Sequence, residues 1–370
     1  MLRIQTFFKL NLIFTFLLLL NTSLCLAEQQ PIVKIGLIYP LTGTMSSFGQ
    51  DMALALPLLE KKFNRENSKY KFELSIEDGK FGQTNAAISA AHKFVDVDQI
   101  KFIVVGSSGE ALQVAPFLES SKVLTVAGFA SHPKISDAGD YIFRTYVNSD
   151  RGIAFVVDHL KQSKLSRLAV LTEQSSFTEA IRDSLTTRFK DNIVFSEDFE
   201  SGSDLKTIIT KARSKKPDAY YLNSTSPANF INLYKQLRES GAKEPFYTFY
   251  VPSVKEVQET LGTLLDGCYY LDFPDNFKSS DDYEKFILEF KQATGQDLKA
   301  PFNFRTNYNA IKAVYDAIIA IGPDPHLAKD YLYKYDQPGA VGQLRFDSKG
   351  DAIDVNLSLK QYASTATHPK

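Results

Sequence analysis

The sequence lacks tryptophan and has only two cysteines among its 370 residues. Any aromatic surface in a binding site must therefore come from its 18 tyrosines and 28 phenylalanines. The two cysteines have no CxxC partner, which removes the usual sequence signal for a zinc site. A net charge of -1 gives no electrostatic attraction for nucleic acid or for an anionic membrane surface.

Catalytic motifs are also missing. The sequence has no GxxxxGK(S/T) phosphate loop and no GxGxxG fingerprint. The stretch 106–109 (GSSG) resembles a nucleophile elbow only superficially, because its second glycine comes one place too early. Five histidines are scattered without an HExxH pattern. We therefore expect no enzyme, no cofactor and no metal site.

The first residues are typical of a secretory signal peptide. Two basic residues precede an apolar run over residues 10–20, and the small residue Ala27 follows. We expect cleavage after residue 27 and a periplasmic location. The apolar run is shorter than the roughly 20 residues that a membrane span needs, so an uncleaved anchor is the weaker alternative, and a lipid-anchored Cys25 is weaker still.

Loss of the signal peptide would leave Cys268 as the only cysteine, so no internal disulfide is possible. Cys268 lies in an apolar stretch without a flanking base that would lower its pKa. We expect a small buried apolar side chain. A reactive thiol is the alternative.

Short apolar runs alternate with helical patterns, which predicts α/β units around mainly parallel sheets. A second cycle begins after Asp150 and repeats the pattern of the first, so we expect two doubly wound, Rossmann-like lobes. The predicted strands cover residues 33–39, 72–77, 101–106, 123–127, 167–172, 192–199 and 218–223, with helices between them. We expect a ligand at the carboxyl ends of these strands, where the lobes face each other.

Several passages of the chain between the lobes are expected, because multiple crossings suit closure around a ligand. Residues 145–150, 273–276 and 321–326 are the predicted crossings, the last because Gly322-Pro-Asp-Pro325 breaks a helix. The predicted divisions are 28–147 with 276–325 for the first lobe, 148–275 with 326–362 for the second, and 363–370 for a disordered tail.

Three segments carry a family resemblance. They are Val33-Lys-Ile-Gly-Leu-Ile-Tyr-Pro-Leu-Thr-Gly43, Phe48-Gly-Gln-Asp-Met52, and Gly339-Ala-Val-Gly-Gln-Leu-Arg-Phe-Asp-Ser-Lys-Gly-Asp351. Together they resemble the branched-chain amino-acid (Leu/Ile/Val) type of periplasmic solute-binding protein. The resemblance extends over essentially the whole mature chain and implies the type I periplasmic binding fold, with two lobes that close on a small molecule. In the last segment, Asp347, Lys349 and Gly350 are expected to be turn residues between two strands.

Ser107 and Ser108 are the first candidate ligand contacts. They follow a predicted strand and begin a helix, where free N–H groups and the helix dipole suit an anion. The resemblance implies that this position grips the carboxylate of an amino acid, with Ser108 as the better match. An ordinary helix N-cap is the alternative.

The resemblance also assigns contacts to the loop after the next strand and to several rings. In the loop, Phe129 would bind through its backbone and Ser131 through its hydroxyl. His132 is expected to be a solvated surface residue, with a ligand contact as the alternative. Phe129 replaces the smaller residue that is more common there. The remaining ring positions, each with core packing as its alternative, are Phe48, Phe177 and Tyr308.

The departures from the family pattern concern the second lobe. Amino-acid binders carry there an acid that pairs with the ligand ammonium, but Phe246-Tyr-Thr-Phe-Tyr-Val-Pro252 contains none. Tyr250 in this stretch, and Ser224 where some members have an aromatic residue, complete the candidate contacts. Glu173 or Glu110 could supply the missing acid. An amino acid, a related carboxylate or an aromatic compound therefore remain as ligand classes.

These observations predict a monomeric periplasmic solute-binding component of an ABC importer, whose partners are a small-molecule ligand and a membrane permease. The alternative is a periplasmic sensor of the same fold that signals to a membrane receptor. A hydrolase built on this scaffold is the least supported reading, because no nucleophile or metal motif accompanies it.

Overall fold

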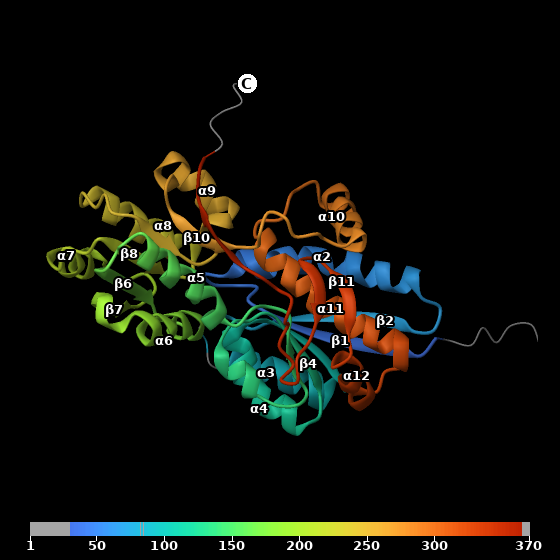
Figure 1. Cartoon of the computed structure of the whole chain (residues 1–370). Coiled ribbons are helices and arrows are strands. Elements are labelled where there is room, and N and C mark those ends of the chain that lie inside the picture. Colours follow the sequence, from blue (N-terminus) through green and yellow to red (C-terminus); the bar gives the residue numbers. More distant parts are fainter. Residues whose placement is uncertain (1–29, 82, 84, 365–370) are drawn as a thin grey trace, which may run out of the picture.

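The computed structural model describes residues 30–81, 83 and 85–364, and the predicted signal peptide and most of the predicted tail lie outside this range. Two lobes lie side by side, each built around its own sheet (Figure 1). Among the described residues, no helix combines the length and apolar character that crossing a membrane requires.

Lobe I contains an all-parallel sheet in the order β2-β1-β3-β4-β5. The central strands β3 and β4 are buried at every position, as expected for a parallel sheet covered on both faces. The strands are β1 (Ile32–Tyr39), β2 (Lys71–Asp78), β3 (Phe102–Ser107), β4 (Leu124–Phe129) and β5 (Ile142–Arg144). The helices are α2 (Ser46–Glu66), α3 (Ala86–His92), α4 (Ser108–Ser120), α10 (Asp281–Thr294), α11 (Pro301–Ile321) and α12 (Pro325–Leu332).

Lobe II also contains a mainly parallel sheet. Its strand order is β13-β10-β9-β8-β6-β7, and only β13 runs antiparallel to its neighbour. Its strands are β6 (Leu168–Glu173), β7 (Ile193–Phe199), β8 (Ala219–Asn223), β9 (Phe246–Thr248), β10 (Tyr269–Asp272) and β13 (Ser358–Gln361). Its helices are α5 (Ser149–Gln162), α6 (Ser176–Phe189), α7 (Lys206–Ser214), α8 (Pro227–Glu239) and α9 (Lys255–Leu261). The predicted fold class, two doubly wound α/β lobes, is confirmed.

The third crossing is not where the sequence pattern placed it. Gly322 ends α11, but the chain turns back as α12, which packs against α11 and β4 of lobe I. The hairpin of β11 (Asp336–Gly339) and β12 (Gly342–Arg345) follows, and Asn309 of α11 accepts a hydrogen bond from Ala340 N. Only β13 joins lobe II, so the crossing lies between Ala352 and Ser358. The helix-breaking prolines mark a turn within one lobe.

A buried ion pair fixes the chain just before this crossing. Arg144, at the end of β5, is fully buried and donates from Nε to Asp351 Oδ1 over 2.8 Å. Its other nitrogens bind the His132 carbonyl and the Ser136 hydroxyl. The predicted turn is also present, because Gly350 has a φ of +76° and Asp347 accepts from the N–H of Lys349. The tail motif therefore has a structural role.

Candidate ligand-binding site

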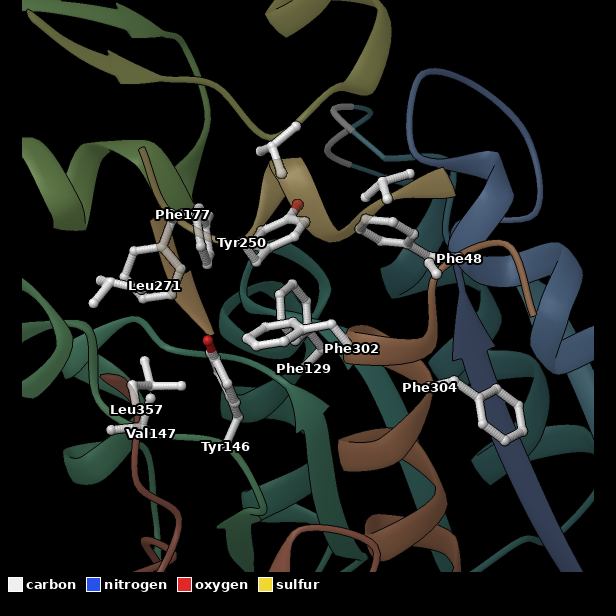
Figure 2. Packing of buried hydrophobic residues seen from close by; sticks show 14 of the residues in the cluster. Phe48, Phe129, Tyr146, Val147, Phe177, Tyr250, Leu271, Phe302, Phe304 and Leu357 are labelled. Carbon is white, nitrogen blue, oxygen red and sulfur yellow. The ribbon is translucent and has the colours of Figure 1, made fainter. Parts of the chain in front are cut away.

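Aromatic rings from both lobes meet where the sheets face each other, and we call them the interlobe aromatic cluster (Figure 2). Phe48 lies in the first turn of α2, and its ring centroid is 5.8 Å from that of Tyr250, which follows β9. Phe177, in the first turn of α6, lies 6.0 Å from Phe129 at the end of β4. The cluster comprises Phe48, Phe129, Tyr146, Phe177, Phe249, Tyr250, Phe273 and Phe302.

Phe129 is the hub of this cluster. Its ring contacts five others, including an edge-to-face contact of 4.9 Å with Tyr250 of lobe II and a contact of 5.7 Å with Phe302 of α11. Only 2% of Phe129 is exposed. A phenyl group therefore occupies space that a smaller side chain would leave open, and it makes this part of the interlobe space apolar.

Ser108 holds the loop that follows β4. Its Oγ accepts hydrogen bonds from Ser131 N at 2.9 Å and from His132 N at 3.3 Å. His132 is 6% exposed, so the expectation of a solvated surface histidine is wrong. Burial and the nearby cations Lys134 and Arg144 lower its pKa, and its Nδ1 accepts from Lys134 N. The loop is buried because these backbone N–H groups find partners inside the protein.

Three buried hydroxyls around the cluster have no hydrogen-bond partner among the described residues: Ser131 Oγ, Tyr146 OH and Thr225 Oγ1. They come from the loop after β4, the first crossing and the loop after β8, respectively. Leaving a buried polar group unpaired costs about 1–3 kcal/mol. A bound molecule that accepts hydrogen bonds would remove this cost.

Glu173 at the end of β6 does not provide a free acid. Its carboxylate accepts hydrogen bonds from the Ser224 hydroxyl, from the N–H groups of Thr225 and Ser226, and from the Asn229 side chain. These contacts bind the loop after β8 to β6 within lobe II. Ser224, a predicted ligand contact, is thus engaged in the same network, and Glu173 is unsuited to the ligand ammonium.

Tyr308 lies apart from the cluster. Its ring packs against Tyr283 at 5.0 Å and Phe286 at 5.2 Å, both in α10, and its hydroxyl donates to Asp282 over 2.7 Å. The prediction of a cleft aromatic is therefore replaced by packing within lobe I. Phe302, six residues earlier on α11, reaches the cluster instead.

Four cluster residues were not among the predicted contacts. Tyr146 and Phe273 belong to the first two crossings, so their position between the lobes could have been used as a signal. Phe249 and Phe302 carry no such signal in the sequence. Cys268 is buried, and burial raises the pKa of its thiol to about 12, which confirms the expected small buried side chain.

Comparison with known proteins agrees with this architecture. The family model described as periplasmic binding protein matches residues 32–349. The Leu/Ile/Val-binding protein homolog 7 of Brucella suis biovar 1 (strain 1330) is 22% identical over 366 residues, covering 92% of this chain and 91% of that protein. The Leu/Ile/Val-binding protein BraC3 of Rhizobium johnstonii is 26% identical over 221 residues, which span 57% of this chain and only 59% of that relative.

Solved structures share the fold. The leucine-binding protein LivK of Thermotoga maritima superposes with a TM-score of 0.78 at 22% identity, covering 90% of this chain and 98% of that one. A solute-binding protein of an ABC transporter from Rhodopseudomonas palustris BisB5, in complex with 3,4-dihydroxybenzoic acid, gives 0.78 at 19% identity, covering 89% and 93%. The two-lobed architecture and the family match over most of the sequence establish that this chain belongs to the periplasmic binding proteins and has their type I fold.

Proposed function

We propose that this protein is the periplasmic solute-binding component of an ABC importer, which captures a small molecule between its lobes by domain closure and delivers it to a membrane permease. The ligand classes are an amino acid, a related carboxylate or an aromatic compound. The observation that carries the proposal is the interlobe aromatic cluster together with its unpaired hydroxyls. Rings from both lobes supply apolar contact, and the hydroxyls supply directional hydrogen bonds.

The candidate contacts fall into two groups. Phe48, Phe129, Phe177 and Tyr250 supply rings, and Ser131 supplies an unpaired hydroxyl. Ser108 and Ser224 act through the loops that they hold, and Ser107 acts through the Glu110 carboxyl, to which its hydroxyl donates. A ligand that touches both lobes stabilises the closed state in proportion to its preference for that state over the open one.

The test begins with native mass spectrometry of the purified mature chain, to detect small molecules that copurify with it. A thermal-shift panel of amino acids, aliphatic and aromatic carboxylates and aromatic amines follows. We expect at least one member to raise the melting temperature, and Phe177→Ala to weaken its binding. The absence of any copurified molecule and of any shift at millimolar concentrations would contradict the proposal. Uptake of the identified ligand should be lost when the gene is deleted.

A further inference from the structure

A polar cavity of about 240 Å³ lies between the lobes, and its lining residue Ser176 directly precedes Phe177 of the aromatic cluster. Lobe I contributes the loop after β2 and the first turns of α4, and lobe II contributes the loop that leads into α6 together with the first residue of α6. A cavity of about 150 Å³ holds benzene in another protein, so the space suffices for a small organic group. The lining includes Phe81, Glu110, Gln113, Gln174, Ser175 and Ser176.

The Glu110 carboxyl forms one wall of this cavity. Glu110 is the third residue of α4 and is 2% exposed. Its Oε2 accepts a hydrogen bond from the Ser107 hydroxyl, whereas Oε1 is buried and has no partner among the described residues. Gly79 leaves room for this carboxyl, because a Cβ there would lie 2.8 Å from Glu110 Cγ.

A second unpaired acceptor lies one turn further along the same helix. Gln113 Oε1 is buried without a partner in the described part of the chain. Residues three apart in a helix lie on the same face, so Glu110 and Gln113 present their oxygens to the same cavity. Two unpaired acceptors call for a group that has several hydrogen-bond donors.

The charges of the cavity favour a cation. Its lining contains no lysine, arginine or histidine, and Asp78 lies close enough to Glu110 to act on its pKa. Burial raises the pKa of Glu110 to about 7, and a neighbouring cation would favour its ionised form. The Glu110 carboxyl already lies at the positive end of α4, where the resemblance expects the carboxylate of the ligand.

We propose that this cavity is an amine subsite, in which Glu110 and Gln113 accept hydrogen bonds from a protonated primary amine of the captured molecule. Phe81 supplies an apolar wall against which the ammonium or its carbon chain packs. The inference rests on the proposed function and narrows its ligand to compounds that carry an amine. It moves the recognition of the ammonium from lobe II to lobe I.

Two matched series of probes test this subsite by calorimetry on the mature chain. The first is L-leucine, isopentylamine and 4-methylpentanoate, and the second is L-phenylalanine, 2-phenylethylamine and 3-phenylpropanoate. Within each series the side chain of the amino acid is kept while either the amino group or the carboxylate is removed. We expect the amine-bearing probes of at least one series to bind tenfold or more tightly than its amine-free acid.

Variants then locate the amine. Glu110→Gln removes the charge while nearly preserving the shape of the side chain. We expect it to weaken the binding of the amine-bearing probe at least tenfold. Gly79→Ala forces the Glu110 carboxyl to move and should weaken the binding of the same probe. This variant provides a second test if Glu110→Gln folds poorly. Glu239→Gln, at an exposed position at the end of α8, is the control and should leave binding unchanged.

Each other outcome overturns the inference. Equal or tighter binding of the amine-free acids, or binding of an amine that is insensitive to both variants, places the ammonium elsewhere or excludes it. Failure of all six probes to bind also contradicts the amine subsite. The proposed function is judged separately by native mass spectrometry, because a copurified molecule without a basic nitrogen would support capture while refuting the subsite.

Discussion

Burial of the Glu110 carboxyl makes the stability of this protein depend on pH in the direction opposite to ordinary acid unfolding. Desolvation raises the pKa of this group from its ordinary value of 4.5 to about 7 in the folded protein. Between these two values the folded chain holds a proton at Glu110 that the unfolded chain releases. The Glu110→Gln variant removes this titration and nearly keeps the shape of the side chain.

The sign and size of this pH dependence follow from proton linkage. Because the folded state binds more protons than the unfolded state, the free energy of unfolding falls as pH rises through this range. The contribution is fully present below pH 4.5 and lost above about pH 7. A change of this size corresponds to roughly 3 kcal/mol. The stability of the wild type relative to Glu110→Gln should therefore decline by about that amount between pH 4.5 and 8.

Urea denaturation of both proteins at several pH values measures this difference. Other groups that titrate in the same range, including His132, are common to both proteins and cancel in the comparison. Glu239→Gln, at an exposed position, should give a curve parallel to the wild type. Parallel curves for Glu110→Gln and the wild type would refute the reasoning, because they would mean that Glu110 is ionised in the folded protein at neutral pH.

Three further substitutions, with Lys349→Met as a comparison for the last, test a packed ring, a buried hydrogen-bond acceptor and an ion pair by urea denaturation. Phe129→Ala removes the hub ring and should cost about 3–5 kcal/mol; a loss below about 1 kcal/mol would contradict its five ring contacts. Ser108→Ala leaves two buried N–H groups without their acceptor and should cost about 1–3 kcal/mol, and an unchanged stability would refute that role. Arg144→Met deprives Asp351 of its partner and should cost about 3 kcal/mol, whereas Lys349→Met at an exposed ion pair should cost less than about 1 kcal/mol.

The fold was predictable from sequence because each lobe uses a strong local pattern. Buried parallel strands appear as continuous apolar runs, and residues 101–106 and 123–127 therefore identified β3 and β4 closely. The third crossing was not predictable in this way. Gly322-Pro-Asp-Pro325 ends a helix whether the chain then changes lobes or turns back, and only the packing of α12 on α11 decides between them.

The candidate site was predictable only where one strand or helix end determined a position. Phe48 and Phe177 occupy matching first turns of α2 and α6, and their rings do meet the same cluster. The prediction of Tyr308 as a cleft aromatic was wrong because the residues of α11 point to several sides of the helix. Six residues rotate a helix by about 240° beyond a full turn, so Phe302 and Tyr308 point in different directions and only one can reach the cluster.

The structure explains the departures from the family pattern in lobe II. Tyr250 stands in the stretch where an acid is expected, and its hydroxyl donates to the Thr225 carbonyl while its ring stacks on Phe302. Glu173, the buried acid at the end of β6, is already hydrogen-bonded to the loop after β8 and to Asn229 of α8. Lobe II therefore presents rings and hydroxyls here, and the unpaired carboxyl oxygen lies in lobe I at Glu110. The Ser107 hydroxyl donates to that carboxyl and Gly79 leaves room for it at the start of α4, which is why we propose that Glu110, and not an acid of lobe II, receives the amine of the ligand.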